Sequence, residues 1–196
     1  MPKNTNDNQG IGRGTPTENY PIVKATNADA AVWGDLLIQS KHVGAIRQGG
    51  PANNQSHTVA PGTGQAVEKM DDQLVVGVFS DGQSADTGYL MVVDLRTAMS
   101  VGAVKPRSVT LTVASACKAT IVPGGSGGYS EQHPHPAVTV TAGGTVSLTL
   151  SGGGGALLKL EPASSESGAA SCGDVLRQTR DWWWNPRKIN LKHAYP

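Results

Sequence analysis

Short apolar segments separated by glycine-rich turns recur between residues 73 and 161, and this pattern constrains the fold more than any other feature. Apolar runs at 73–79 and 89–95 flank the turn-forming segment DGQSADTG, which predicts a β-hairpin with a long tip. Further runs lie at 108–113, 118–122, 137–141, 146–150 and 156–160. Because no helical pattern interrupts this series, we expect antiparallel rather than parallel strands.

Apolar and polar residues alternate within these runs, so each strand has one dry face and one wet face. Val109, Leu111 and Val113 share one side of their run, and Gly143 and Gly144 supply a two-residue turn before the next. The chain is long enough for one hydrophobic core. We therefore predict an all-β fold, an antiparallel β-sandwich of Greek-key or immunoglobulin-like type, over residues 67–161.

The segment before the sandwich has a different character. Residues 1–25 are mostly polar and aperiodic, which predicts a disordered lead-in. Residues 26–46 are predicted to be the one N-terminal helix and its continuation, with Thr26 or Asn27 as the cap. The apolar stripe of this helix is expected to pack against a larger body, and it consists of Val32, Trp33, Leu36 and Leu37.

The segment after the sandwich, residues 162–196, is predicted to be a polar linker followed by a poorly ordered tail. This tail is rich in tryptophan and is the one locally basic part of the chain. The run Trp182–Trp184 is its most unusual feature. Indole rings can stack on sugars, and they can form an aromatic patch for single-stranded nucleic acid. We favour packing of these rings on the sandwich or on Trp33, and carbohydrate contact by Trp182, Trp183 and Trp184 stays a speculative alternative.

Charge and hydropathy narrow the range of partners. The formal net charge is +1, so no global positive field attracts nucleic acid, and we expect no nucleic-acid partner. No apolar run approaches the length of a membrane span, so we expect none. The first residues lack the apolar segment of a secretory signal. This start predicts a chain that stays inside the cell unless it has been cut from something longer, and the localisation is left open.

Cys117 and Cys172 are the only cysteines, and they are 55 positions apart. This spacing suits neither a redox CxxC pair nor a zinc site. We expect two free thiols, because disulfides are rare in chains without an export signal. A single bridge between the two stays open.

Three segments together resemble the C-terminal part of a glycoside hydrolase. TNADAAVWGDLLIQSKHVGAI is similar to the last helix of the catalytic barrel, and DDQLVVGVFSDGQSADTGYLMVVDL resembles the start of the β domain that follows it. VTVTAGGTVSLTLSGGGGALLKLE is similar to the closing strands of that domain. The resemblance covers residues 26–161 and departs from the family pattern at Asp94, where asparagine is usual. It implies a non-catalytic module of a family that is often secreted or lysosomal.

The catalytic barrel itself is absent from the sequence, so we assign no catalytic residue and expect no enzyme activity. Five acidic residues are explained by turn and strand-end chemistry: Asp71, Asp72, Asp81, Asp86 and Asp94. His133 and His135 form an HxH pair that can bind metal, but no third ligand is evident. We therefore expect no metal and no cofactor.

Three functional hypotheses follow. The first is an accessory β-sandwich module of a glycosidase that packs on the catalytic barrel through Val32, Trp33, Leu36 and Leu37 and stabilises it. The second is a free-standing carbohydrate-binding module. The third is an assembly protein anchored by its tryptophan-rich tail. The expected partner is thus a glycosidase barrel, a carbohydrate or another protein.

Overall fold

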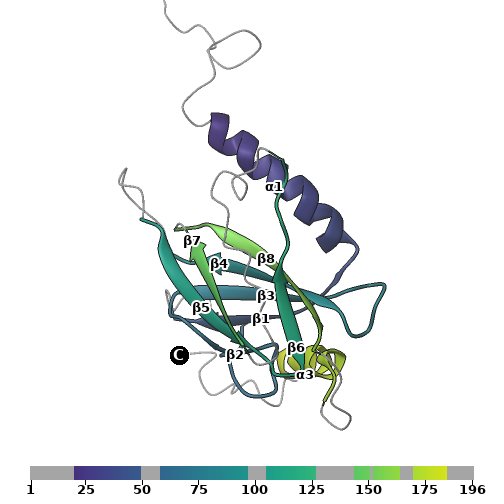
Figure 1. The fold of residues 1–196 in the computed structure, drawn as a ribbon. Helices are drawn as coiled ribbons and strands as arrows, with labels where there is room; N and C mark the ends of the chain where they lie inside the picture. The colour runs from purple at the N-terminus through teal and green to yellow at the C-terminus, as the bar shows by residue number, and fades with distance from the viewer. Residues whose placement is uncertain are drawn as a thin grey trace, which may run out of the picture.

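The chain folds into two antiparallel sheets with two helices in its described part, and the all-β class is confirmed (Figure 1). The computed structural model describes residues 20–49, 58–96, 105–126, 144–150, 152–163 and 170–184. At 20–22 and 181–184 it describes the backbone alone. The Greek-key or immunoglobulin-like assignment stays a prediction.

The larger sheet has five strands in the order β1-β3-β4-β8-β6. The predicted hairpin is confirmed, because β3 and β4 pair in register from Leu74 opposite Asp94 to Ser80 opposite Gly88. The strands are β1 (Lys41–Gln48), β3 (Leu74–Ser80), β4 (Gly88–Asp94), β6 (Cys117–Ile121) and β8 (Gly155–Pro162).

The smaller sheet has the order β2-β5-β7. It contains β2 (Val67–Met70), β5 (Arg107–Val113) and β7 (Thr145–Leu150). The alternation predicted for 108–113 and 146–150 is confirmed, since every second residue of β5 and β7 is buried. The predicted strand at 137–141, and Gly143 of the turn after it, lie outside the described residues.

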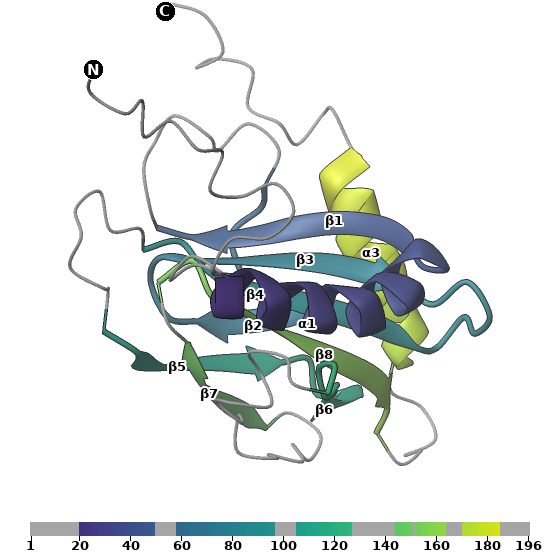
Figure 2. The ribbon, with the colours of Figure 1, turned by 90° about the horizontal axis from the view of Figure 1, so that it is seen from above.

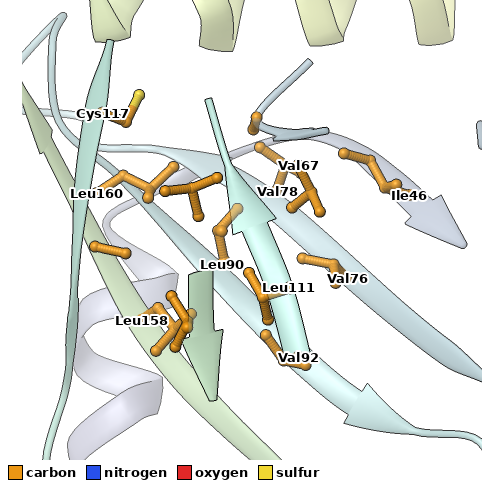
Figure 3. Close-up of a cluster of buried hydrophobic side chains, with 14 of the residues drawn as sticks. Ile46, Val67, Val76, Val78, Leu90, Val92, Leu111, Cys117, Leu158 and Leu160 are labelled. Atoms are coloured by element: carbon orange, nitrogen blue, oxygen red, sulfur yellow. The ribbon is translucent and has the colours of Figure 1, made fainter. Parts of the chain in front are cut away.

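The core lies between the inner faces of the two sheets. Val76 and Val78 of β3, Leu90 and Val92 of β4, and Leu111 of β5 are fully or almost fully buried there. Figure 3 shows these side chains converging from both sheets. Burying such apolar side chains is the main favourable contribution to folding.

Helix α1 (Tyr20–Ile38) lies on the other side of the five-stranded sheet, and Figure 2 shows it in front of β4 and running roughly along the strands. Two predictions for this region are wrong. The helix begins at Tyr20 rather than after residue 25, and Pro21 suits its first turn because proline lacks only an N–H that is unpaired there anyway. Residues 41–46 are not a continuation of the helix but the first part of strand β1.

Strand β1 escaped prediction because its alternation is interrupted. Its pairing with β3 shifts register between His42 and Gly44, and Val43 is buried at this irregularity. A β-bulge changes which face the following residues point to, so the period of two is lost. Strand β2 is too short for its period to be recognised, and it begins where the sandwich was predicted to begin.

Helix α3 (Cys172–Trp184) corrects the prediction of a poorly ordered C-terminal tail over 162–196. It contacts β1, β3 and β8 and closes one end of the sandwich (Figure 1). Its apolar face is spaced i, i+3, i+4, and Cys172, Val175 and Leu176 join the core cluster. Residues 164–169 and 185–196 lie outside the described residues.

Cys117 and Cys172 form a disulfide with both side chains fully buried, so the expectation of two free thiols is wrong. The bond joins the start of β6 to the first residue of α3. Two side chains 55 residues apart meet because α3 folds back over the end of the sheet. The spacing alone does not carry that information.

Candidate docking surface on helix α1

The exposed large hydrophobic side chains of the described residues are all on helix α1. Val23 is 53% exposed, Val32 is 39% exposed and Ile38 is 84% exposed. Single exposed apolar residues are common, whereas large contiguous apolar patches mark interaction sites, so the arrangement of these residues on the helix decides what they mean. Neither α1 nor α3 is long and apolar enough to cross a membrane, and no other helix of the described segments is.

Helix geometry places most of this exposed surface on one side of α1. The residues on this side follow the spacing i, i+4, i+7, i+8, i+11, i+15, and we name them the docking face: Val23, Asn27, Ala30, Ala31, Gly34 and Ile38. All six are exposed, and a Cβ atom added to Gly34 would meet no atom within 4 Å. A surface helix normally carries charged side chains on its outer side, and this face has none.

The opposite side of α1 is turned toward the five-stranded sheet. Ala25 and Asp29 of the helix are buried. Tyr89 of β4 and Leu157 of β8 are buried as well, although they alternate with the core-facing residues of their strands. None of these four belongs to the core cluster. These four residues are therefore buried outside the core, on the side of the sheet where α1 lies.

The segment that follows β6 fixes the orientation of α1. The Trp33 Nε1–H donates a hydrogen bond to the carbonyl of Pro123 at 3.2 Å, and the Gly125 N–H donates to Asp29 Oδ1 at 3.1 Å. A Cβ atom at Gly125 would lie 2.0 Å from the carbonyl oxygen of Ala28, so only glycine allows this approach. These contacts hold the docking face outward.

The four residues predicted to pack on another domain are distributed over several sides of the helix. Val32 is exposed on a flank of α1, whereas Trp33, Leu36 and Leu37 are half-buried. Sequence reasoning missed Val23 and Ile38, which carry most of the exposed apolar surface. The spacing of Val23, Ala30, Ala31, Gly34 and Ile38 places them along one helical side, but it does not say whether that side faces the sheet or the solvent.

The tryptophan run lies in a different place. The backbone of Trp182, Trp183 and Trp184 forms the C-terminal end of α3, and their side chains lie outside the described residues. Carbohydrate contact by these rings stays a prediction. His133 and His135 also lie outside the described residues.

Asp94 forms ion pairs with two arginines, Arg96 and Arg107. It is fully buried, and its carboxylate accepts hydrogen bonds from Arg96 Nε at 2.8 Å and from Arg107 Nε at 3.2 Å. Burial alone would raise the pKa of this carboxyl, but the hydrogen bonds from Arg96 and the charge of Arg107 outweigh it and hold the pKa below its ordinary value. Because Arg107 lies on β5 and Asp94 on β4, the cluster joins the two sheets.

The other acidic residues considered above also have structural partners. Asp71 Oδ2 accepts a hydrogen bond from the Thr110 N–H at 2.7 Å, and Asp81 Oδ1 accepts one from the Gln83 N–H at 2.9 Å. Asp86 Oδ1 accepts one from the Ser171 hydroxyl at 3.2 Å. Asp72 packs beside Gly49. The bond of Asp81 is of the turn type expected from the sequence, whereas Asp71 and Asp86 bond to residues far away in the sequence.

A shallow depression of about 250 Å³ at the edge of β1 is lined by Arg47, Gln48, Gly49, Thr58, Val59 and Ala60. The described residues contain no group of three or more histidine, cysteine, aspartate or glutamate side chains placed to hold a metal ion. The docking face is therefore the feature that most calls for an explanation.

A scan against models of protein families, a search of curated proteins and a search of solved structures each found no match to this chain. The resemblance to the glycoside hydrolase β domain thus stands on the three sequence segments alone.

Proposed function

We propose that this chain is a non-catalytic accessory module that packs on a partner domain through the docking face of α1. The single observation that carries the proposal is the concentration of exposed large hydrophobic side chains on α1 in the described residues. The partner that the resemblance implies is a glycosidase catalytic barrel. In that family, the corresponding helix is the last one of the barrel.

The arrangement of the module supports this role. The Pro123–Gly125 segment holds α1 on the sheet while its docking face stays uncovered by the described residues. Burial of apolar surface is more favourable than its exposure to water by about 25 cal/mol for each Å² of accessible area. Covering Val23 and Ile38 with a barrel surface would recover that free energy and stabilise both partners.

The test uses a glycosidase catalytic barrel that is produced without its own β domain. We expect this chain to form a 1:1 complex with the barrel and to raise its melting temperature. Ile38→Glu places a charge at the most exposed apolar position of the docking face, so we expect it to abolish complex formation. Gln39→Glu, at the exposed residue directly after α1 and outside the docking face, is the matched control and is expected to bind normally.

The outcomes separate the three hypotheses. If the wild-type chain leaves the barrel unbound and unstabilised, the proposal is wrong. Retardation of the chain in a polysaccharide affinity gel, with a loss on Trp183→Ala, would favour carbohydrate binding instead. Loss of partner capture after removal of residues 174–196, with Ile38→Glu still binding, would favour anchoring by the tail.

A further inference from the structure

Helix α1 carries two exposed charged side chains in its described part, and they are of opposite sign. Lys24 and Asp35 are both exposed, and neither forms an ion pair with the described residues. They are eleven residues apart, which is about 16 Å along the helix axis and within about 20° around it. Both therefore lie on the same flank of the docking face, one near each end.

This placement of charge is self-complementary in one orientation only. When two copies of α1 pair in antiparallel fashion about a two-fold axis, the same flank of each helix meets the other. Lys24 of one copy then lies opposite Asp35 of the second copy, and the second pair forms by symmetry. In a parallel two-fold pair the same flanks lie on opposite sides of the interface, so Lys24 and Asp35 of the two copies do not meet.

The apolar residues of the docking face fit the same register. With Lys24 opposite Asp35, the helices cross next to Ala30 and Ala31, whose small side chains allow the axes to approach to about 8–10 Å. Val23 of one copy then lies at a level between Gly34 and Ile38 of the second copy. At each end of the helix pair, the Val23 side chain of one copy thus lies opposite the space between Gly34 and Ile38 of the other copy.

We propose that the docking face of α1 also binds a second copy of this chain, as an antiparallel two-fold helix pair. The inference rests on the docking face used in the proposed function, and it implies that a catalytic barrel and a second copy compete for that face. A single helix pair buries less than the roughly 1,200–2,000 Å² of a stable interface. The dimer is therefore weak and dissociates on dilution.

The experiment is sedimentation velocity of the full chain from about 10 µM to about 1 mM, where weak dimers are populated. Lys24→Glu and Asp35→Lys each turn both attractive pairs into repulsive ones, so each is expected to raise the dissociation constant roughly tenfold. The double variant Lys24→Glu/Asp35→Lys restores both pairs and is expected to dimerise like the wild type. Lys41→Glu, an exposed lysine on β1, is the matched control and is expected to have no effect.

A mixture of the two single variants gives a sharper test. One Lys24→Glu chain and one Asp35→Lys chain have two attractive pairs between them in the antiparallel arrangement, so we expect heterodimers to form. A wild-type chain that stays monomeric at about 1 mM overturns the inference. A dimer whose dissociation constant is unchanged by both charge reversals overturns it as well. A monomeric chain that still stabilises the barrel overturns this inference alone. A charge-dependent dimer with no effect on any barrel overturns the proposed function alone.

Discussion

The two helices are attached to the sandwich in opposite ways. Helix α3 is joined to the core by the disulfide of Cys172 and by the packing of Val175 and Leu176. In addition, Thr179 Oγ1 accepts a hydrogen bond from the Ala66 N–H at 3.0 Å. The described residues of helix α1 contribute nothing to the core cluster, and Trp33 and Asp29 hold the helix by hydrogen bonds to the segment after β6. The difference indicates that α3 completes the fold, whereas α1 presents a surface.

The largest expected effect is at the disulfide. Replacing both cysteines, as Cys117→Ala/Cys172→Ala, removes a cross-link across 55 residues and is expected to lower the free energy of unfolding by about 4 kcal/mol. Urea unfolding of the variant, and of the wild-type protein with and without a thiol reductant, measures this difference in the free energy of unfolding. The reduced wild type should match the variant. A loss below about 1 kcal/mol would mean that α3 is no more firmly attached than α1.

A matched pair of leucines compares the two helices directly. Leu176→Ala in α3 removes a buried core side chain and is expected to cost about 3 kcal/mol, whereas Leu36→Ala in α1 truncates a half-buried one and is expected to cost about 1 kcal/mol. Both values come from the same urea titration. The comparison fails if the two substitutions cost the same, because α1 would then be part of the cooperative core.

A smaller effect is expected at the contact between the two sheets. Asp94→Asn leaves Arg96 and Arg107 without their carboxylate, and we expect a loss of about 2 kcal/mol, since water partly screens both guanidinium groups. Amide hydrogen exchange should then accelerate in α3 and the core strands together. Acceleration confined to α1 would show that α1, not the sandwich, depends on this cluster.

The same residue gives the protein a pH dependence. The pKa of Asp94 is lower in the folded chain than in the unfolded one. Its contribution to stability is therefore complete above the unfolded-state pKa of about 4, and it is lost as the pH falls through the folded-state pKa. Urea titrations from pH 7 to pH 3 should show a steeper loss for the wild type than for Asp94→Asn. Parallel curves would exclude Asp94 as the source of acid sensitivity.

Local patterns predicted the sandwich strands well and the attachments of the helices poorly. The hairpin of β3 and β4 follows from two apolar runs and a polar tip, and the alternation of β5 and β7 is uninterrupted. Strand β1 was missed because a register shift at His42–Gly44 breaks its period. Pairing of Cys117 with Cys172 depends on tertiary placement that no spacing encodes.

The start of helix α3 carries a capping signal in the sequence. The Asp174 N–H donates to the Ser171 hydroxyl, and the Ser171 N–H donates to the Asp174 carboxylate at 3.0 Å, which is a reciprocal helix cap. Its sequence form, serine followed three residues later by an acid, precedes an apolar spacing at 172, 175 and 176. The neighbouring Arg177 lowers the pKa of Asp174 to about 2, so this cap stays charged at ordinary pH.

The docking face could be predicted only in part. The sequence shows an apolar stripe on the helix, but which stripe covers the chain's own sheet depends on the contacts of Trp33 with Pro123 and of Asp29 with Gly125. These contacts bring together residues about 90 positions apart. They turn Val23 and Ile38 outward, and no local pattern determines that choice.

Hydroxyl-radical footprinting of the chain, alone and with a glycosidase barrel that lacks its own β domain, tests the central claim most directly. We expect Val23 and Ile38 to be strongly labelled in the free chain and protected in the complex, while Val175 and Leu176 of α3 are weakly labelled in both. Unchanged labelling of Val23 and Ile38 in the complex, with protection elsewhere on the module, would contradict the assignment of α1 as the docking surface.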